Sequence, residues 1–386
     1  MDISSKDTIN IEVIMSKKRI LHVKYILAYD GASIIEYRLA QLLNDEFIFD
    51  WFLLSDQKGC YEDRFEAIES KIYHCPAMKK EFGTNSEIAT FFRFLKEYQY
   101  DTVYFDTDSP CRAILACVAR LAGVKHCIMH SHASHSEKKA NTILNFIYRK
   151  LMFFSVTDCV ACSKPAAAWL FSKKKAKTAI IITNGIDTHQ FVYNSESRKT
   201  VRAFLNIPDS SCVIGHVGRF SEVKNHSKLI GIFNEFHKIH SESFLILIGD
   251  GELKDKIERF VSELKLSEYV KFIGNIDNVE TYLSAMDAFV LPSLFEGLPL
   301  TAVEAECSGS NVYISDGVPD EAILTRNTKK IPLSLSDKEW AMQIVEDLKQ
   351  SNINRSDAAE IVRSKGYDIK DSAETLFNLL RGVKSN

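Results

Sequence analysis

The sequence is short of prolines, of long apolar runs and of net charge. It has eight prolines in 386 residues, a net charge of −3 at pH 7, and no apolar run near the length of about 18 residues that spans a bilayer. This composition excludes collagen-like and disordered chains, and the balanced charge argues against nucleic-acid binding. No strand-like segment is followed by Gly-x-Gly-x-x-Gly, which disfavours a dehydrogenase. A chain this long exceeds a single hydrophobic core, so we expect two domains.

The nine cysteines lack the pattern of a disulfide framework. They are odd in number, scattered, and mostly embedded in apolar runs, as is typical of reduced cytosolic thiols. Cys159 and Cys162 have CxxC spacing, but residues 155–163 are typical of a strand, in which side chains three apart point to opposite faces. We therefore expect neither a metal site nor a redox pair there. Residues 1–16 lack the order of a signal peptide, which favours a cytoplasmic location.

Positive charge is concentrated between Arg120 and Ile180, a segment with eleven basic and two acidic residues and a net charge of +9. Such a segment indicates either solvated helix faces or a surface that meets anionic lipid headgroups or a lipid-linked phosphate. Residues 141–154 are apolar with one basic pair, and we expect a core helix there. The alternative is peripheral docking of this segment, with Lys173–Lys177, at the inner face of the cell membrane.

Strands and helices alternate along the chain in two successive arrays, which predicts parallel βαβ units. We expect two doubly wound α/β domains, at residues 17–183 and 184–365, with ligand at the carboxyl ends of the strands. A final helix, at about 366–383, is expected to pack back on the first domain. The expected strands are 19–25, 47–54, 71–75, 101–105 and 126–129, followed by 212–217, 244–248, 270–273, 288–291 and 311–315. The expected helices are about 34–43, 86–98, 110–122, 226–240, 252–264, 279–285, 301–307 and 369–381.

The densest motif is the segment 291–305, Leu-Pro-Ser-Leu-Phe-Glu-Gly-Leu-Pro-Leu-Thr-Ala-Val-Glu-Ala. A buried strand is expected to end at its first residue, and a helix to begin with Pro299 in its first turn. Free backbone amides at Leu300 and Thr301 then make the start of that helix a phosphate cradle. Glu296 in the loop and Glu304 one turn into the helix are both able to border one pocket and accept hydrogen bonds from sugar hydroxyls.

A second motif, Gly218-Arg-Phe-Ser-Glu-Val-Lys224, follows another expected strand. Gly218 permits a close approach of the backbone. Arg219 and Lys224 can converge on a diphosphate, the first through its planar fork and the second as a point charge.

Together these strings resemble the C-terminal domain of retaining glycosyltransferases of the GT-B fold, family 4. The Glu-x7-Glu motif of that family is matched by Glu296 and Glu304, and its Gly-Arg…Lys phosphate site by Arg219 and Lys224. The resemblance covers about residues 17–380 and is nearest to bacterial capsule, exopolysaccharide and O-antigen transferases. Further matches lie at 182–187, which resembles the interdomain Pro-Asn-Gly-Val-Asp linker with threonine in place of proline, and at 249–252, 272–274 and 315–319.

The resemblance implies two Rossmann-like domains that face each other across a cleft. It implies that Glu304 holds the ribose, that Glu296 holds the hydroxyls of the donor sugar, and that the two cations neutralise the departing diphosphate. Residues 272–276 would border the base. No metal and no cofactor are implied beyond the nucleotide-sugar co-substrate, expected to be a UDP-hexose. The donor-binding residues implied are Gly31, Asn184, Gly218, Arg219, Lys224, Ile276, Glu296, Gly297, Leu298, Pro299, Leu300, Thr301 and Glu304.

The N-terminal half matches the family less well. Relatives often have Gly-Gly-x-Glu after the first strand, whereas this chain has Asp30-Gly31-Ala-Ser-Ile-Ile-Glu36, with one glycine missing and the glutamate displaced. His130 and His132 follow a strand, and we expect His130 near the transferred sugar and His132, with Gly31, on the acceptor side. The string Asp106-Thr-Asp108 has the spacing of a metal-binding DxD motif, but we interpret it as a loop and helix N-cap.

The sequence therefore predicts transfer of a hexose, with retention, from a nucleotide diphosphate sugar to a lipid-linked oligosaccharide in surface-polysaccharide biosynthesis. A sugar-nucleotide epimerase on the same fold explains the Glu and Arg/Lys motifs less well. From a different class, a catalytically silent partner subunit is favoured only by the altered loop at Gly31.

Overall fold

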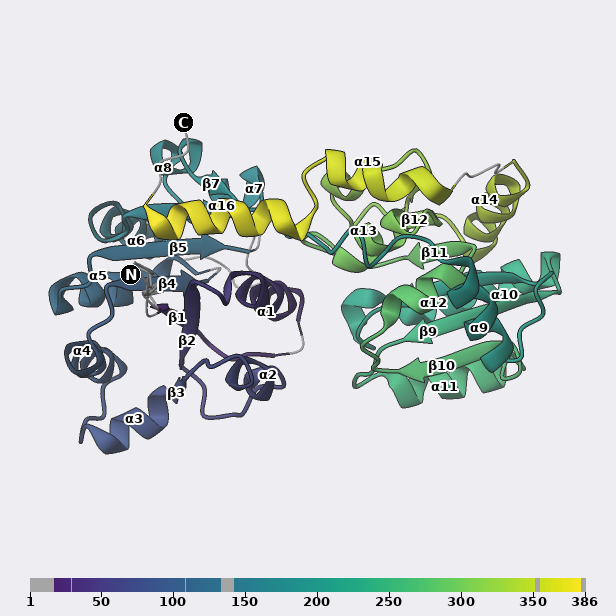
Figure 1. Ribbon diagram of the computed structural model, residues 1–386. Helices are drawn as coiled ribbons and strands as arrows, with labels where there is room; N and C mark the ends of the chain where they lie inside the picture. The colour runs from purple at the N-terminus through teal and green to yellow at the C-terminus, as the bar shows by residue number, and fades with distance from the viewer. Residues whose placement is uncertain (1–16, 29, 108, 133–141, 351–354, 383–386) are drawn as a thin grey trace, which may run out of the picture. The chain divides into compact units, whose positions relative to one another are not determined.

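The computed structural model describes residues 17–28, 30–107, 109–132, 142–350 and 355–382 (Figure 1). They form two compact units, one built mainly from the chain up to Cys159 and the other mainly from Val160 onward, with residues 30–35 and 131–132 grouped with the second. None of the described helices is long and apolar enough to cross a membrane.

The first sheet has seven strands in the order β3-β2-β1-β4-β5-β6-β7, and every pairing recorded in it is parallel. Strand β2, between β3 and β1, and the central strand β4 are buried at every position, as both faces of a doubly wound sheet require. The elements are β1 (Lys18–Lys24), α1 (Gly31–Leu43), β2 (Phe47–Leu53), α2 (Glu62–Glu66), β3 (Ile72–His74), α3 (Cys75–Glu81), α4 (Glu87–Tyr98), β4 (Thr102–Asp106), η1 (Pro110–Arg112), α5 (Ala113–Ala122), β5 (His126–Ser131), α6 (Thr142–Ser155), β6 (Asp158–Ala161), α7 (Lys164–Leu170), α8 (Lys173–Lys177) and β7 (Ile180–Ile181).

The second sheet has six parallel strands in the order β10-β9-β8-β11-β12-β13. The reversal of strand order beside β8 is the switch point at which doubly wound folds bind ligands. The elements are α9 (Ser195–Phe204), β8 (Cys212–Val217), η2 (Glu222–Lys224), α10 (His226–Ile239), β9 (Ser243–Ile248), α11 (Lys254–Glu263), β10 (Val270–Gly274), α12 (Val279–Ala285), β11 (Ala288–Leu291), α13 (Leu300–Cys307), β12 (Asn311–Ser315), η3 (Asp320–Ala322), β13 (Thr328–Ile331), α14 (Asp337–Gln350), η4 (Arg355–Asp357), α15 (Ala358–Ser364) and α16 (Ile369–Arg381).

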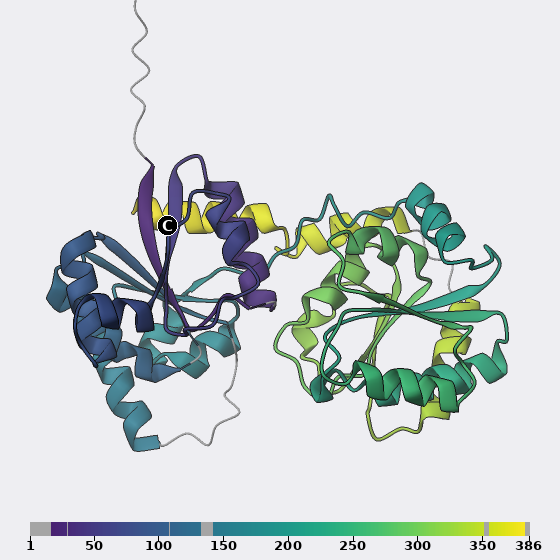
Figure 2. The same ribbon diagram turned by 90° about the horizontal axis from the view of Figure 1, so that it is seen from below.

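Two hydrophobic clusters, one on each face, hold the second sheet between helices, as Figure 2 shows. Strand β11 supplies both clusters alternately, with Phe289 and Leu291 on one face and Ala288 and Val290 on the other. This alternation is the two-residue period of a strand buried on both sides.

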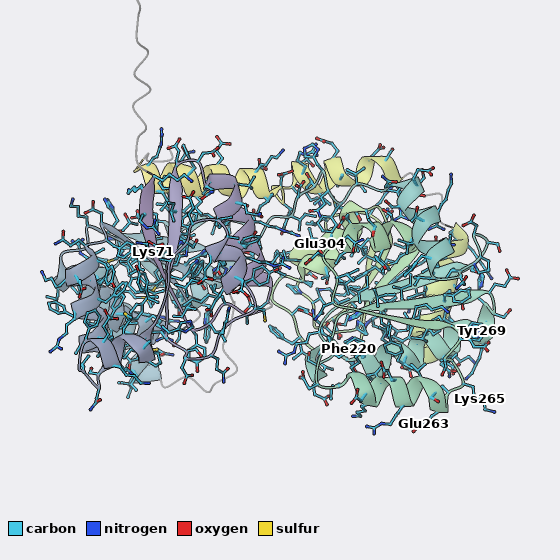
Figure 3. All side chains as sticks on the ribbon, turned by 60° about the horizontal axis from the view of Figure 1, so that its bottom comes forward. Lys71, Phe220, Glu263, Lys265, Tyr269 and Glu304 are labelled. Atoms are coloured by element: carbon cyan, nitrogen blue, oxygen red, sulfur yellow. The ribbon has the colours of Figure 1, made fainter. Side chains whose placement is uncertain are left out.

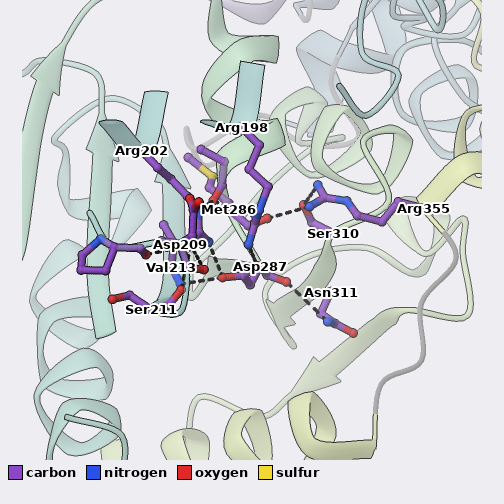
Figure 4. Close-up of polar contacts among 12 residues, drawn as sticks. Arg198, Arg202, Asp209, Ser211, Val213, Met286, Asp287, Ser310, Asn311 and Arg355 are labelled. Carbon is purple, nitrogen blue, oxygen red and sulfur yellow. Dashed lines mark hydrogen bonds and ion pairs between the residues drawn. The ribbon is translucent and has the colours of Figure 1, made fainter. Parts of the chain in front are cut away.

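A polar cluster around Asp287 closes the amino-terminal edge of this sheet (Figure 4). Its carboxylate accepts hydrogen bonds from Arg198 Nη2 and Arg202 Nη2, both at 2.7 Å, and from the amide of Val213 at 2.8 Å. Arg202 is completely buried, and burial lowers the pKa of its guanidinium. Arg355 donates to the carbonyl oxygens of Met286 and Ser308, which ties the start of η4 to the same edge. The cluster ties α9 and η4 to the starts of β8 and β11, at the edge opposite to the carboxyl ends of the strands.

The expected strands are all present, and helix Ile369–Arg381 has the predicted bounds. The sequence interpretation missed the strands β7 and β13 and the helices α2, α3, α7, α8, α9, α14 and α15. The predicted boundary between residues 183 and 184, and the packing of the last helix on the first domain, stay predictions.

Two local predictions were wrong. Asp106 is not in a loop: it is the buried last residue of β4, and Ser109 is the N-cap of η1, without a side-chain cap bond. Asp108 and Asn141 lie outside the described residues. Helix α6 is not a core helix throughout, because six of its large apolar side chains are exposed.

Candidate functional site

Three loops are joined at the carboxyl edge of the second sheet, after strands β8, β11 and β12. The amide of Leu294 donates to the carbonyl of Val223 at 2.8 Å, and the amide of Glu296 donates to the carbonyl of Gly317 at 3.0 Å. A Cβ atom at Gly317 would lie 2.3 Å from the Leu294 carbonyl oxygen, so only glycine fits there. Asn225 secures the junction by donating from Nδ2 to the carbonyl of Pro292 at 3.1 Å. The backbone therefore fixes the relative positions of the two predicted motifs.

Lys224 and Glu296 form a direct ion pair at this junction. Lys224 Nζ lies 2.6 Å from Glu296 Oε1, and the hydroxyl of Ser293 donates to the same oxygen at 2.7 Å. Both charged side chains are largely buried, with 18% and 12% of their surface exposed. The sequence had suggested that Glu296 borders a pocket and that Lys224 binds a diphosphate, and the structure brings the two groups into contact. It did not suggest Ser293 as a partner.

Arg219 points to a different carboxylate. Its Nη2 and Nε atoms donate to Glu252 Oε2 at 3.0 and 3.2 Å, and the guanidinium is mostly exposed. The pKa of Glu252 lies below its usual value because its own backbone amide, and then the Arg219 guanidinium, favour the carboxylate. Glu252 follows the Gly249-Asp-Gly string, which the sequence had marked without giving it a role. Convergence of Arg219 and Lys224 on one anion stays a prediction.

Helix α13 begins at Leu300, so Pro299 precedes the helix and does not lie in its first turn as predicted. Pro299 is its N-cap, with extended backbone angles and no side-chain cap, and Leu300 is the first helical residue. The amides of Ala302 and Val303 donate to the Pro299 carbonyl at 3.0 and 3.3 Å. The amides of Leu300 and Thr301 precede these first intrahelical bonds, as in an anion-binding helix start.

Glu304 lies on the buried side of α13, and Figure 3 labels it within the second unit. It is 7% exposed, whereas the fully buried Glu306 two residues later is structural. Glu306 accepts hydrogen bonds from the amides of Leu324 and Thr325 at 2.9 and 2.8 Å, which holds the loop before β13. Between Glu296 and the helix start lie Gly297, Leu298 and Pro299, of which Gly297 is exposed and Pro299 buried.

The predicted base-binding segment follows β10. Gly274 has a φ of +81°, and its carbonyl accepts from the amide of Gly249 at 2.9 Å. A Cβ atom at Gly249 would lie 2.2 Å from the Gly218 carbonyl oxygen, so the loops after β8 and β9 touch through their backbones. Ile276 is partly buried against the core of the same unit. Gly218 and Ile276 therefore belong to neighbouring loops of one sheet edge.

Two buried histidines lie beneath the Gly218 loop, and sequence reasoning missed both. His216 Nδ1 donates to the carbonyl of Val290 at 2.8 Å, and burial lowers the pKa of His216 well below its usual value. His226 stacks on Phe220 with ring centroids 4.1 Å apart; Figure 3 labels Phe220. Burial, and then the charge of Lys224, lower the pKa of His226 to about 4. Both rings are neutral at physiological pH, so they pack as uncharged supports of the loop.

Asn184 lies in the segment that precedes the second sheet. It is buried, and its Oδ1 has no hydrogen-bond donor among the described residues. The segment is held by α16: Ile186 forms a bridge with Asp368, and Ser372 Oγ donates to the carbonyl of Thr183 at 2.8 Å. The hydroxyl of Thr183 donates to the carbonyl of Gly366 at 2.6 Å, so the threonine that replaces the usual proline takes part in anchoring the linker.

His130 belongs to a buried polar network at the carboxyl edge of the first sheet. Its Nδ1 lies 2.9 Å from the hydroxyl of Tyr104, whose pKa burial raises well above its usual value. His22 Nδ1 donates to Asp106 Oδ2 at 2.9 Å. Asp106, His130 and His132 each place a potential metal-ligand atom within 4.8 Å of the others. The expectation that this protein uses no metal stays a prediction. Gly31 is the first residue of α1.

Known proteins resemble the chain in both sequence and structure. Residues 197–352 match the family described as Glycosyl transferases group 1. The chain is 27% identical over 380 residues to EpsF of Bacillus subtilis, whose name calls it a glycosyltransferase, and the match covers 94% of this chain and 96% of EpsF. It is 25% identical to an Escherichia coli UDP-Gal:alpha-D-GlcNAc-diphosphoundecaprenol alpha-1,3-galactosyltransferase, over 78% of this chain and 80% of that one.

Among solved structures, Anabaena HepE in complex with UDP superposes with a TM-score of 0.77 at 17% identity, covering 94% of this chain and 100% of HepE. The seven- and six-stranded parallel sheets agree with this likeness. The chain therefore has the GT-B fold of two Rossmann-like domains, and residues 197–352 are similar to the group 1 glycosyl transferases.

Proposed function

We propose that this protein is a glycosyltransferase of surface-polysaccharide biosynthesis that transfers a hexose from a UDP-sugar to a lipid-linked glycan, with retention of configuration and without a metal ion. The observation that carries the proposal is the Lys224–Glu296 ion pair beside the start of α13. A cation, a carboxylate and free helix amides within one sheet edge offer partners for the diphosphate and for the hydroxyls of a nucleotide sugar.

Each group has a distinct role in this proposal. Lys224, Arg219 and the α13 amides neutralise the charge that develops on the leaving diphosphate, a role in which preorganised donors are most effective. Glu296 accepts hydrogen bonds from the sugar hydroxyls, and Glu304 from the ribose. His130, held by Tyr104, lies near the transferred sugar when the domains close and exclude water.

The relatives support the substrate class. The E. coli relative is named for a UDP-galactose donor and a diphosphoundecaprenol acceptor, and HepE was crystallised with UDP and with UDP-glucose. A capsular polysaccharide transferase of Staphylococcus aureus, CapH, is 24% identical over 84% of this chain and 89% of its own length. These names favour a UDP-hexose donor and a lipid-linked acceptor.

Thermal shift with a panel of UDP-glucose, UDP-galactose and GDP-mannose tests the donor site. A matching nucleotide sugar at a hundred times its dissociation constant should raise the melting temperature by about 5–10 °C. Glu304→Ala, Arg219→Ala and Lys224→Gln should each reduce the shift. Lys228→Gln is the matched control, because Lys228 is also a buried, ion-paired lysine of this unit, 2.9 Å from Asp337.

If no nucleotide sugar stabilises the wild type, or if Lys228→Gln weakens the shift as much as Lys224→Gln, the donor site is not the one proposed. Slow hydrolysis of the stabilising donor in the absence of acceptor then separates an enzyme from a catalytically silent subunit. A silent subunit binds the donor without releasing UDP.

A further inference from the structure

Helix α6 presents an apolar face to solvent. Ile143, Phe146, Ile147 and Phe154 recur at spacings of three, four and seven residues, so they lie along one side of the helix. Ile143 is 73% exposed, Phe146 60% and Phe154 81%. The opposite side is buried, with Met152 in the core and the helix packed on α5. The exposure is therefore a property of one face and not of a frayed helix.

Such a face is unusual in a protein that meets only water. Exposed large apolar side chains are common singly, but a contiguous set on one helix indicates a partner surface. The described chain exposes twenty large apolar side chains, and six of them, including Leu144 and Phe153, are on this one helix. In Figure 2 the first turns of α6, blue-green at the lower left, project away from the sheet of their own unit.

The charges on and around the helix select the kind of partner. Helix α6 contains two basic residues and no acidic one. Lys150 Nζ lies over the ring of Phe146 at 4.7 Å, so a cation accompanies the apolar face. Residues 120–180 carry a net charge of +9 in the sequence. A second copy of this face would bring like charges together, whereas anionic lipid headgroups would be attracted.

We propose that the exposed face of α6 docks the protein on an anionic lipid bilayer, with Ile143, Phe146, Ile147 and Phe154 inserted below the headgroups and Lys150 at the phosphate level. Apolar side chains at the interface with lysines reaching the phosphates form the binding mode of interfacial helices. The inference stands on this helix face and does not depend on the proposed transfer reaction, although a lipid-linked acceptor would be presented at the same surface.

Flotation of the full-length protein with lipid vesicles tests the proposal. The protein should float with vesicles of phosphatidylglycerol and phosphatidylcholine, and bind at least about tenfold more weakly to pure phosphatidylcholine. Phe146→Glu/Phe154→Glu should reduce binding to the anionic vesicles by at least about tenfold. Phe204→Glu is the matched control, because Phe204 is equally exposed, at 73%, on α9 of the other unit. It should bind vesicles like the wild type.

Three results would overturn the proposal. The first is that the wild-type protein does not float with anionic vesicles. The second is that the double substitution leaves vesicle binding unchanged. The third is that the wild-type protein is a dimer in solution and the double substitution converts it to a monomer. In the last case a second copy of the chain covers the face. If the melting temperature of Phe146→Glu/Phe154→Glu falls, Phe146→Ser/Phe154→Ser is used in its place, because it removes the apolar rings without adding charge. The nucleotide sugar should still raise the melting temperature of every variant. Vesicle binding therefore tests membrane docking, and the thermal shift tests the donor site independently.

Discussion

Asp287 neutralises two arginines at the amino-terminal edge of the second sheet, and loss of its negative charge should destabilise that unit severely. Asp287→Asn keeps the shape of the side chain but takes the carboxylate away from Arg198 and Arg202. Arg202 is completely buried, so its charge cannot be solvated instead. The position also holds β11 against β8 through the amide of Val213.

The size of the effect follows from burial. Breaking a buried ion pair by removing one partner costs about 3–5 kcal/mol, because the remaining charge stays desolvated. The side chain of Asp287 is itself 26% exposed, so the lower end, about 3 kcal/mol, is expected. For a unit of this size that corresponds to a fall in melting temperature of about 6–12 °C. Arg198→Met removes only the partly exposed ion pair between Arg198 and Asp287, and should lower the free energy of unfolding by less than about 1 kcal/mol.

Urea unfolding followed by circular dichroism and by tryptophan fluorescence measures both variants. Binding of the nucleotide sugar at low temperature should survive in Asp287→Asn, because the proposed donor site lies at the opposite edge of the sheet. A loss below about 1 kcal/mol in Asp287→Asn, or an equal loss in Arg198→Met, would refute the reasoning that the buried Arg202 charge sets the cost.

Three further predictions concern the donor site and its supports. Burial lowers the pKa values of His216 and His226 in the folded protein, so the unfolded chain binds more protons in acid. The free energy of unfolding should therefore fall as the pH drops from about 6.5 toward 4, by up to about 1.4 kcal/mol per pH unit for each histidine. His226→Phe should remove one of the two contributions, as measured by urea titrations at several pH values. Gly249→Ala should displace the Gly218 loop, because its Cβ atom would lie 2.2 Å from a carbonyl oxygen. In the thermal shift assay, the rise in melting temperature caused by the donor should shrink by more than the melting temperature of the free protein falls. Lys224→Gln should lower kcat/KM for sugar transfer by about 10²–10³-fold, and a loss no larger than that of Lys228→Gln would contradict the assigned role.

The sequence predicted the alternating elements well because each strand and helix leaves a local signature. The strands that end at Val217 and Leu291 are apolar runs followed at once by glycine- and proline-containing loops, so both the sheet and its functional edge could be located. Helices α9 and α14 are more polar than the strands, so they lack the apolar runs that mark the buried elements.

The pairings within the site could not be predicted, because they depend on contacts between loops far apart in the sequence. Lys224 meets Glu296 across 72 residues, and Arg219 meets Glu252 across 33. Nothing in the spacing of these residues says which cation takes which carboxylate. Asp106 shows the same limit: its local string indicates a loop, but β4 extends through it because pairing with β5 continues to His130.

The Lys224–Glu296 pair also bears on donor selectivity under the proposed function. Both charges are largely buried, so separating them without replacement would leave two desolvated ions, which is costly. A bound diphosphate alone replaces only the carboxylate that faces Lys224. A bound sugar alone supplies only hydroxyl donors for Glu296. A nucleotide diphosphate sugar supplies both, so the pair opens at least cost for the intact donor. The spent nucleotide still pairs with Lys224 but leaves Glu296 without a partner, and its release lets the ion pair form again. The Lys224–Glu296 ion pair thereby favours binding of the intact donor and release of the nucleotide.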